Sequence, residues 1–326
     1  MTDKHSFVSP GLTVVTRDGS PLCFEGKRVT LALGTFDGVH IAHRALLDCA
    51  IEQKHKLSAS LAGAFCFAES PISVLRGIHV PTISTREEKL RLMFEAGLDF
   101  VAIADFAEFR DVSAEQFVKE TLCRDLSCVG AVCGFNHRFG KGGAGDSSLL
   151  SSILGEENVI TYPEVKLGGE TVSSTAIRAH LAAGELDIAN KMLGRPFSLS
   201  APVLAGKKLG RTIGCPTTNQ LFPGGSVNLC RGIYATLCYT EGGSVYVGAS
   251  NVGVRPTIDG ALDDHSFNCE TLIADFSGDL YGQNLTLEFH KYLRPECKFG
   301  SLDELSAAIR NDLVCACEYF EGIAKN

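Results

Sequence analysis

Hydrophobic and polar positions follow two different patterns along the chain. From residue 29 to about 193, apolar runs typical of buried strands alternate with stretches of helical periodicity. The predicted strands lie at 28–34, 60–67, 99–106 and 127–135, and the predicted helices at 42–56, 85–97 and 113–126. This alternation predicts an α/β, Rossmann-like domain with a parallel sheet and helices on both of its faces.

The pattern changes after about residue 197, where short strands are broken by glycine-rich turns. The EGG triplet at 241–243 predicts a hairpin turn. A final amphipathic helix follows Ser301, which is predicted to form a capping box with Glu304. Many strands and one terminal helix indicate a small β-barrel. We expect two domains, 1–193 and 194–326, that meet near the Gly-Arg-Pro triplet at 194–196.

Composition narrows the class of protein. Apolar residues make up 45% of the chain, charged residues 21%, and no stretch approaches the roughly 18 apolar residues of a membrane span. The polar start lacks a secretion signal, so we expect a cytoplasmic protein that does not bind membranes. A net charge of −8 argues against a nucleic-acid surface but not against a nucleotide site. The thirteen cysteines form no CxxC pair and are interpreted as small buried residues in a reducing compartment.

The loop after the first predicted α/β strand carries the first candidate chemistry. Gly34 and Gly38 permit a tight turn, and His40 and His43 lie three residues apart at the start of a helix. This spacing places both imidazoles on one face at the positive end of the helix dipole, where they can hold nucleotide phosphates. The alternative is a capped helix with two surface histidines.

Two later segments can reach the same edge of the sheet. The glycine-rich basic loop 134–143 follows the fourth predicted strand, although a generic flexible loop would read similarly. Hydroxyl side chains at 173–175 begin another helix, and Arg178 follows one turn later. Hydroxyls, free amides and an arginine suit a phosphate, whereas simple helix capping is the alternative.

The densest motif lies in the second domain, at 206–219. Three glycines and three cations form a loop whose amides can face phosphate oxygens. Thr217 and Asn219 alternate by two, so on an extended segment they point to one side and offer oxygen ligands for Mg²⁺. A basic surface turn is the alternative reading.

One carboxylate in the second domain is a candidate general base. Glu270 enters an otherwise apolar strand, where a charge is costly unless it is paired or used. It could accept the proton of a primary alcohol. Glu288 is a weaker rival because alternation may direct it to solvent.

The ordered motifs resemble those of prokaryotic bifunctional riboflavin kinase/FAD synthetases. The segments GTFDGVHxxH, GFxxRFGKGG and SSTxxR resemble the adenylyltransferase domain of that family, which is a nucleotidyltransferase. GRxxGxPTxN and NxGxRPT, at 210–219 and 251–257, resemble its riboflavin kinase domain, a six-stranded barrel with a C-terminal helix. The likeness runs from about residue 15 into the last helix.

The resemblance implies two reactions with ATP: phosphorylation of riboflavin to FMN and adenylylation of FMN to FAD with release of pyrophosphate. It assigns catalysis to Glu270, His40, His43 and Arg178. It assigns nucleotide and phosphate binding to Gly34, Phe36, Asp37, Ser173, Ser174, Thr175, Gly206, Lys207, Gly210, Arg211 and Gly214. Thr217 and Asn219 would bind Mg²⁺, Asn136 and Arg294 would contact or enclose the flavin, and the substrates are ATP, riboflavin and FMN.

Several departures from the family pattern keep alternatives open. Ala42 replaces the usual glycine between the histidines, Ser70 lies in a divergent segment, His137 replaces an aromatic residue, and Ala176 replaces a basic one. A riboflavin kinase with a degenerate first domain is therefore an alternative. A non-catalytic flavin- or nucleotide-binding regulator is a third reading, which the presence of Glu270, Thr217 and Asn219 opposes.

Overall fold

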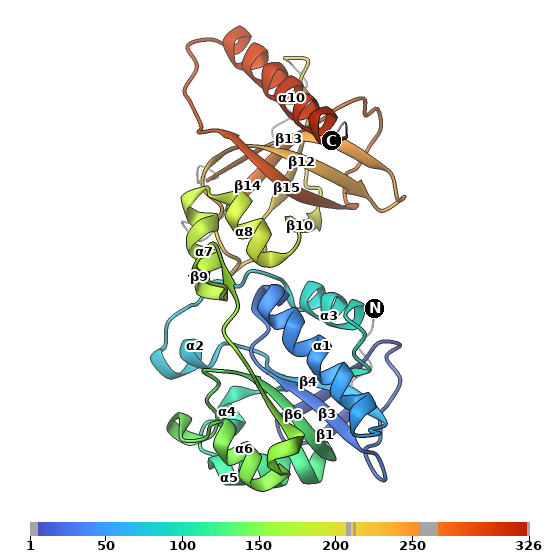
Figure 1. Cartoon of the computed structure of the whole chain (residues 1–326). Coiled ribbons are helices and arrows are strands. Elements are labelled where there is room, and N and C mark those ends of the chain that lie inside the picture. The colour runs from blue at the N-terminus through green and yellow to red at the C-terminus, as the bar shows by residue number, and fades with distance from the viewer. Residues whose placement is uncertain (1–5, 207–209, 211–212, 255–266, 325–326) are drawn as a thin grey trace. The chain divides into compact units, whose positions relative to one another are not determined.

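The structure is a computed structural model that describes residues 6–206, 210, 213–254 and 267–324 (Figure 1). Contacts divide the chain into two compact units, residues 1–174 and 175–326, and each is described by itself.

A seven-stranded sheet forms the centre of the first unit, in the order β1-β2-β5-β4-β3-β6-β7. Its strands are β1 (Ser6–Ser9), β2 (Leu12–Thr16), β3 (Val29–Leu33), β4 (Leu61–Phe67), β5 (Phe100–Ala104), β6 (Cys128–Gly134) and β7 (Val159–Tyr162). The run from β5 to β7 is parallel, and β2 joins β5 in antiparallel fashion. All four predicted strands are confirmed as β3 to β6. A small hairpin of β8 (Lys166–Leu167) and β9 (Glu170–Thr171) lies outside this sheet.

Helices cover both faces of this sheet, as predicted (Figure 1). The face packed by α1 (Ile41–Lys56) and α3 (Arg86–Glu95) buries Leu47, Met93 and Ala32. The opposite face packs against η2 (Phe117–Asp125) and α6 (Ser147–Leu154). The shorter helices are η1 (Asp37–Val39), α2 (Pro71–Arg76), α4 (Phe106–Phe109), α5 (Ala114–Gln116), η3 (Lys141–Gly143) and η4 (Glu156–Asn158).

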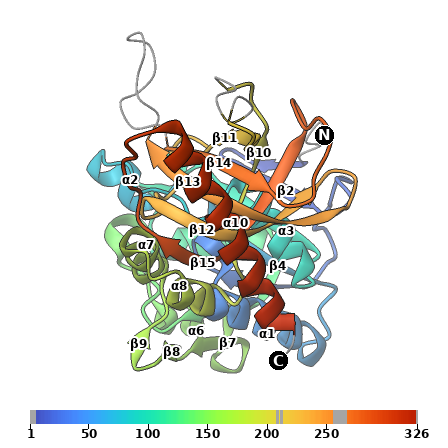
Figure 2. The same cartoon turned by 90° about the horizontal axis from the view of Figure 1, so that it is seen from above.

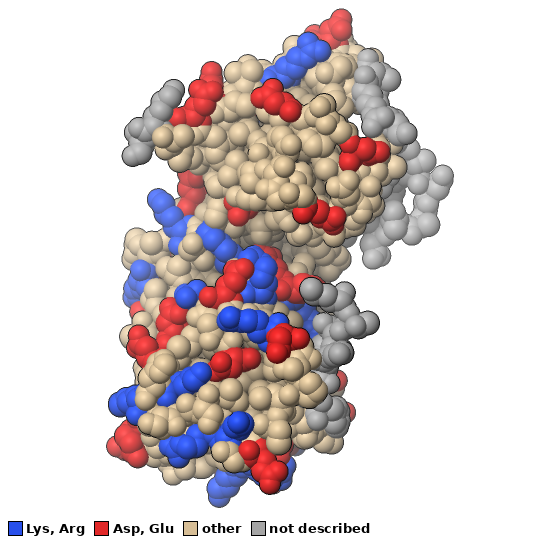
Figure 3. All heavy atoms as spheres, turned by 90° about the vertical axis from the view of Figure 1, so that its right-hand side faces the viewer, with Lys and Arg blue, Asp and Glu red and all other residues tan. Residues whose placement is uncertain are grey.

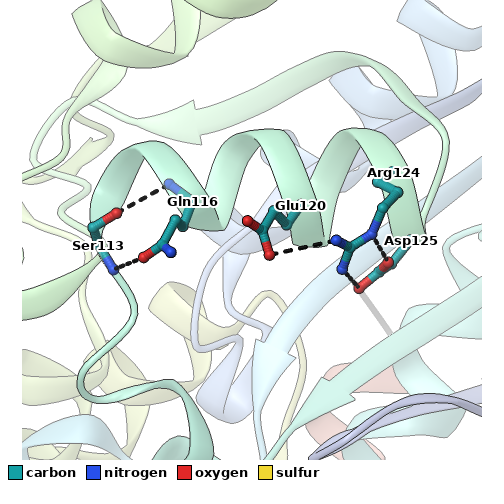
Figure 4. A network of polar contacts seen from close by, with 5 residues as sticks. All are labelled: Ser113, Gln116, Glu120, Arg124 and Asp125. Carbon is teal, nitrogen blue, oxygen red and sulfur yellow. Dashed lines mark hydrogen bonds and ion pairs between the residues drawn. The ribbon is translucent and has the colours of Figure 1, made fainter.

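The predicted helix at 113–126 begins with a reciprocal cap, shown in Figure 4. The Ser113 hydroxyl accepts from the amide of Gln116, and the Gln116 side chain accepts from the amide of Ser113. At the other end, Arg124 pairs with Glu120 and Asp125. The segment winds as α5 and then as the wider π-helical η2, which places Phe117 and Leu122 in the core.

A curled six-stranded antiparallel sheet forms the second unit, in the order β10-β15-β12-β13-β14-β11. Its strands are β10 (Phe197–Pro202), β11 (Thr217–Leu221), β12 (Gly232–Thr240), β13 (Val245–Val254), β14 (Phe267–Ile273) and β15 (Asn284–Arg294). The curl brings the two edge strands together, so that the Leu204 amide donates to the Asn219 carbonyl at 2.7 Å. The predicted hairpin at 241–243 is confirmed between β12 and β13.

Among the described residues, three helices of eight or more residues belong mainly to the second unit. The long α10 (Leu302–Ala324) lies across β12 and β13 in Figure 2. α7 (Ser174–Ala183) and α8 (Leu186–Leu193) precede the sheet, and α8 packs on β15 and β10. The predicted capping box of α10 forms in altered form: Ser301 caps the Glu304 amide, but the Glu304 carboxylate accepts from Gly300 instead of Ser301.

Charge is distributed unevenly on the face that Figure 3 draws. Basic and acidic side chains of the first unit are interspersed there, while much of the second unit is uncharged. That face shows no broad basic surface of the kind a nucleic-acid-binding protein uses. Within the described residues, no helix combines the length and apolar character that crossing a bilayer requires.

Candidate functional sites

The loop after β3 is a strained turn that leads into α1. Phe36 is fully buried in a left-handed conformation, with φ of 52°. A Cβ on Gly34 would lie 3.2 Å from the Phe36 ring, and a Cβ on Gly38 would lie 2.9 Å from Ile83. Gly38 also has a φ of 75°. A side chain at Gly38 would therefore be strained by both its backbone and its contact, whereas one at Gly34 would require the Phe36 ring to shift by a few tenths of an ångström.

The structure brings His40 and His43 together. Their rings stack with centroids 3.6 Å apart, and His40 Nδ1 accepts from the His43 amide at 3.2 Å, so that His40 caps α1. Burial, with smaller contributions from the charges of His40 and Lys89, holds the pKa of His43 well below its usual range. His43 is thus neutral at pH 7, and its buried Nδ1 has no hydrogen-bond partner among the described residues. A neutral imidazole can donate from a ring N–H to a phosphate oxygen.

The start of the SSTxxR segment contacts the same loop. The Ser174 hydroxyl donates to the Asp37 carbonyl at 3.0 Å. The Asp37 carboxylate accepts from the Ile83 amide at 2.9 Å, which ties the segment before α3 to the turn. Ser173 precedes this contact, and Thr175 and Arg178 lie on α7, in the second unit. Two motifs 137 residues apart therefore meet at Asp37.

The glycine-rich loop after β6 is less basic than its sequence suggests. The Arg138 guanidinium pairs with Asp146 at 3.1 Å, and the Lys141 ammonium pairs with Asp111 at 3.0 Å. Asn136 is exposed at the end of β6, the strand next to β3. Burial lowers the pKa of His137 to about 4, so this ring is neutral at pH 7. Asn136 is therefore open to a ligand, as is its exposed neighbour Phe135.

Sequence reasoning missed a cation beside the histidines. Lys89 lies on α3, four residues after the cap Thr85, and its charge contributes to the low pKa of His43. It therefore lies within electrostatic reach of that imidazole. The TREEK segment was interpreted only as a helix start, because the approach of α3 to the loop is a long-range contact.

In the second unit, strand register places a row of polar side chains across the sheet. Asn219 on β11 is opposite Glu270 on β14, and Glu270 is opposite Asn251 on β13. Asn251 faces Ile233 on β12, which is paired with Arg294 on β15. Directly paired residues project from the same face of a sheet. Asn268, two residues before Glu270, donates to its carboxylate at 3.3 Å.

A pocket of about 230 Å³ opens on this face beneath the first turns of α10. Its polar lining includes Glu270, Asn251 and Thr217. Apolar side chains line the rest, among them Ile233, Leu272, Phe299, Leu305 and Ile309. A mostly apolar pocket with a few polar groups at one wall suits a flat aromatic ligand that bears a polar chain.

A second pocket, of about 380 Å³, adjoins the first at Thr217. Thr217 lines both pockets, and its neighbours Pro216 and Thr218 line the second one together with residues 276–281. A group transferred from a ligand in one pocket to a ligand in the other would therefore pass Thr217. Glu270 lies in the wall of the first pocket.

The described part of the 206–219 loop packs closely. A Cβ on Gly206 would lie 2.6 Å from the Asn219 amide nitrogen, and one on Gly210 would lie 2.3 Å from the Cys215 carbonyl. Gly214 has a φ of 70°. The predicted phosphate ligands Lys207 and Arg211 lie outside the described residues, as do residues 255–257 of the NxGxRPT stretch.

Arg294 holds the pocket together through its guanidinium. Nε and Nη2 donate to the two carboxylate oxygens of Asp312 on α10 at 2.7 and 2.6 Å, and Nη1 donates to the Pro295 carbonyl and the Cys297 sulfur. The rival base Glu288 accepts from the Tyr239 hydroxyl at 2.9 Å and is not part of either pocket wall described above.

Among the described residues, no group of three or more His, Cys, Asp or Glu side chains could hold a metal ion. Hydroxyl, amide and single carboxylate oxygens, as at Thr217, Asn219 and Glu270, are the type of ligand that Mg²⁺ uses when phosphates complete its shell. A site made of Thr217, Asn219 and Glu270 contains only one His, Cys, Asp or Glu side chain, so it would not form a group of this kind.

Comparisons with known proteins match both units. Residues 193–320 match the family model of riboflavin kinase, and residues 25–176 match that of FAD synthetase. The bifunctional riboflavin kinase/FMN adenylyltransferase of Escherichia coli K12 is 35% identical over 299 residues, covering 90% of this chain and 93% of that protein. The protein of the same description from Bacillus subtilis is 30% identical, covering 92% and 95%. A solved structure described as a macrolide-efflux protein from Streptococcus pneumoniae has a TM-score of 0.79 at 26% identity, covering 88% of this chain and 93% of that chain.

Proposed function

The chain belongs to the family of bifunctional riboflavin kinases/FMN adenylyltransferases, and from that premise we propose which residues carry each reaction. The enzyme phosphorylates riboflavin to FMN and adenylylates FMN to FAD, both with ATP. The proposed catalytic domains are residues 1–193 and 194–326. The compact units divide earlier, after Ser174, because α8 packs on the second sheet.

In the proposed kinase site, Glu270 is the general base and riboflavin occupies the largely apolar pocket. The observation that supports this most directly is the position of Glu270 on the pocket wall, in register with Asn219 and close to Thr217. Glu270 would take the proton from the ribityl 5′-hydroxyl, whose oxygen attacks the γ-phosphorus of ATP. ATP would occupy the second pocket, which adjoins the first at Thr217. By resemblance, Gly206, Lys207, Gly210, Arg211 and Gly214 bind its phosphates.

The residues beside Glu270 fit a magnesium ion bound with ATP. Thr217 and Asn219 offer oxygen ligands from one face of β11, and Gly206 leaves room for the Asn219 amide where a Cβ would clash. Bound Mg²⁺ would neutralise charge on the phosphates. Arg294 would enclose the flavin by holding α10 over the pocket through Asp312.

In the proposed adenylyltransferase site, the phosphate of FMN attacks the α-phosphorus of ATP and pyrophosphate leaves. A phosphate monoester is already a nucleophile, so the site supplies position and charge stabilisation instead of a strong base. His40 and His43 would donate to the triphosphate, with Gly34, Phe36 and Asp37 shaping the loop that holds it. By resemblance, Arg178, Ser173, Ser174 and Thr175 bind phosphate and Asn136 contacts the flavin.

The cytoplasm is the compartment that we propose for both reactions. All thirteen cysteines are free, and six of them are buried. Free thiols persist in a reducing compartment.

Two matched substitutions test the kinase assignment. Purified protein is incubated with MgATP and either riboflavin or FMN, and the flavins are separated by chromatography. Glu270→Gln is expected to lower FMN formation by about 10²- to 10⁴-fold, as loss of a general base does, and to spare FAD formation from supplied FMN. Glu288→Gln makes the same chemical change outside the pocket wall and should leave both reactions near wild type.

A reciprocal variant tests the other site. His40→Ala is expected to slow conversion of FMN to FAD and to leave riboflavin phosphorylation near normal. Loss of both reactions in folded Glu270→Gln protein, or of kinase activity in His40→Ala, would contradict the division of labour between the units.

A further inference from the structure

Asn251 carries a buried polar atom that the fold does not use. Its Oδ1 is out of contact with solvent and has no hydrogen-bond partner among the described residues. A buried amide oxygen without a partner is costly, so such a group points to an unfilled role.

Two other side-chain oxygens share this property but have a structural explanation. Gln53 donates through Nε2 to the Asn158 carbonyl, and Gln220 donates to the carbonyls of Ala201 and Leu285, while Oε1 of each glutamine is unpaired. Each glutamine thus ties separate segments together. Neither lines one of the two pockets, whereas Asn251 lies in the wall of the pocket that contains Glu270.

The position of Asn251 relative to Glu270 suggests what it binds. The two residues are directly opposite on β13 and β14, and paired Cβ atoms lie about 5 Å apart. An uncharged acceptor in a mostly apolar pocket is suited to a neutral donor such as a hydroxyl. Riboflavin carries secondary hydroxyls on its ribityl chain, next to the primary hydroxyl that is phosphorylated.

We propose that Asn251 is a specificity-determining residue whose Oδ1 accepts a hydrogen bond from a secondary ribityl hydroxyl of riboflavin. The inference rests on the proposed kinase site. Asn251 thereby selects flavins that bear the polyol chain and holds the primary hydroxyl beside Glu270. A site built around an acceptor rejects an analogue that lacks the donor, because the acceptor is then left buried and unpaired.

The test compares riboflavin with its 2′-, 3′- and 4′-deoxy analogues in wild type and Asn251→Ala. Asn251→Ala should raise KM for riboflavin about tenfold, as loss of one hydrogen bond does, with kcat little changed. Wild type should discriminate against one deoxy analogue by a similar factor, and Asn251→Ala should lose that discrimination. Quenching of flavin fluorescence on binding gives the same comparison without turnover.

Two controls separate a binding role from other roles. Val245→Ala removes an exposed side chain on the same strand and should change neither KM nor analogue preference. Asn251→Leu should melt no lower than wild type, because the replaced oxygen has no partner to lose. A lower melting temperature would overturn the proposal by showing a structural role.

Two other outcomes would also overturn the proposal for Asn251. An unchanged KM and unchanged analogue preference in Asn251→Ala would overturn the proposal, as would a loss of kcat with a shifted pH profile, which would mean that Asn251 acts on Glu270. If wild type does not phosphorylate riboflavin, the proposed kinase site is refuted. The fluorescence comparison would then still test whether Asn251 binds a ribityl hydroxyl.

Discussion

Breaking the ion pair between Arg294 and Asp312 tests how α10 is held over the proposed flavin pocket. The Asp312 side chain is only 6% exposed, and the guanidinium bonds both of its oxygens. Removing one partner of a fully buried pair costs about 3–5 kcal/mol. Because the Arg294 side chain is 29% exposed, water can reach the gap, and we expect Arg294→Met to cost about 2 kcal/mol. For a unit of this size, that lowers the melting temperature by about 4–8 °C.

A double-mutant cycle shows whether the two residues act as a pair. Asp312→Leu should destabilise by a similar amount, since it leaves Arg294 without its acceptor. The double variant Arg294→Met/Asp312→Leu places two apolar side chains together and should be more stable than either single variant. Thermal unfolding of all four proteins, followed by circular dichroism, measures the coupling.

Riboflavin binding by the same four proteins tests the function of the pair. If Arg294 encloses the flavin by holding α10, the double variant should recover much of the affinity that each single variant loses. Additive loss of stability would refute the pairing argument. Recovery of stability without recovery of riboflavin KM would instead show that Arg294 contacts the flavin directly.

Two further predictions concern the first unit. Gly38→Ala should destabilise it by about 1–3 kcal/mol and slow FAD formation, because Gly38 has a φ of 75° and the new Cβ would lie 2.9 Å from Ile83. Denaturant unfolding measures the loss of stability, and the FMN-to-FAD assay measures the loss of activity. Gly26→Ala is a control for backbone strain alone, because Gly26 has a φ of 68° and a Cβ there would have nothing within 4 Å. The pKa of His43 is low in the folded protein, so below about pH 6.5 the unfolded chain binds a proton that the folded protein does not bind. The contribution of His43 to the free energy of unfolding is therefore complete above about pH 6.5. It is lost at about 1.4 kcal/mol per pH unit as the pH falls below that value. His137, whose pKa burial lowers to about 4, adds a similar slope over this range. Unfolding measured between pH 7.5 and 5 should therefore show the sum of both contributions, and His43→Gln should remove about half of it; an unchanged slope would mean that His43 is protonated in the folded state.

The elements that the sequence predicted well are those whose pattern is local. The strands β3 to β6 are continuous apolar runs, and α1 and α3 have clear helical periodicity, so each was predicted within a few residues. β2 and β7 were not predicted, because they are only partly buried and so have a weaker apolar pattern. β3 and β5 are similarly short, but each is buried along its whole length.

The parts of the site that sequence missed depend on distant contacts. Asn251 lies within a recognised motif, but only strand register places it opposite Glu270. Asp312 appears as an ordinary polar position of an amphipathic helix, and its burial becomes visible only when α10 packs near Arg294. The cap of α10 differs for a local reason, since the Glu304 carboxylate reaches one residue further back, to the Gly300 amide.

The proposed kinase site depends on strand register, and the opposite side of the same strands helps to fix that register. Ser250 and Thr271, the neighbours of Asn251 and Glu270, are fully buried and bonded to each other at 2.8 Å, and Ser250 also bonds Thr236 at 2.8 Å. A slip of one residue would exchange the two faces, leaving these hydroxyls without partners and burying the Glu270 carboxylate in their place. The hydroxyl chain therefore disfavours the register in which Glu270 would point away from the pocket. Stability on one face of the sheet thus determines the chemistry available on the other.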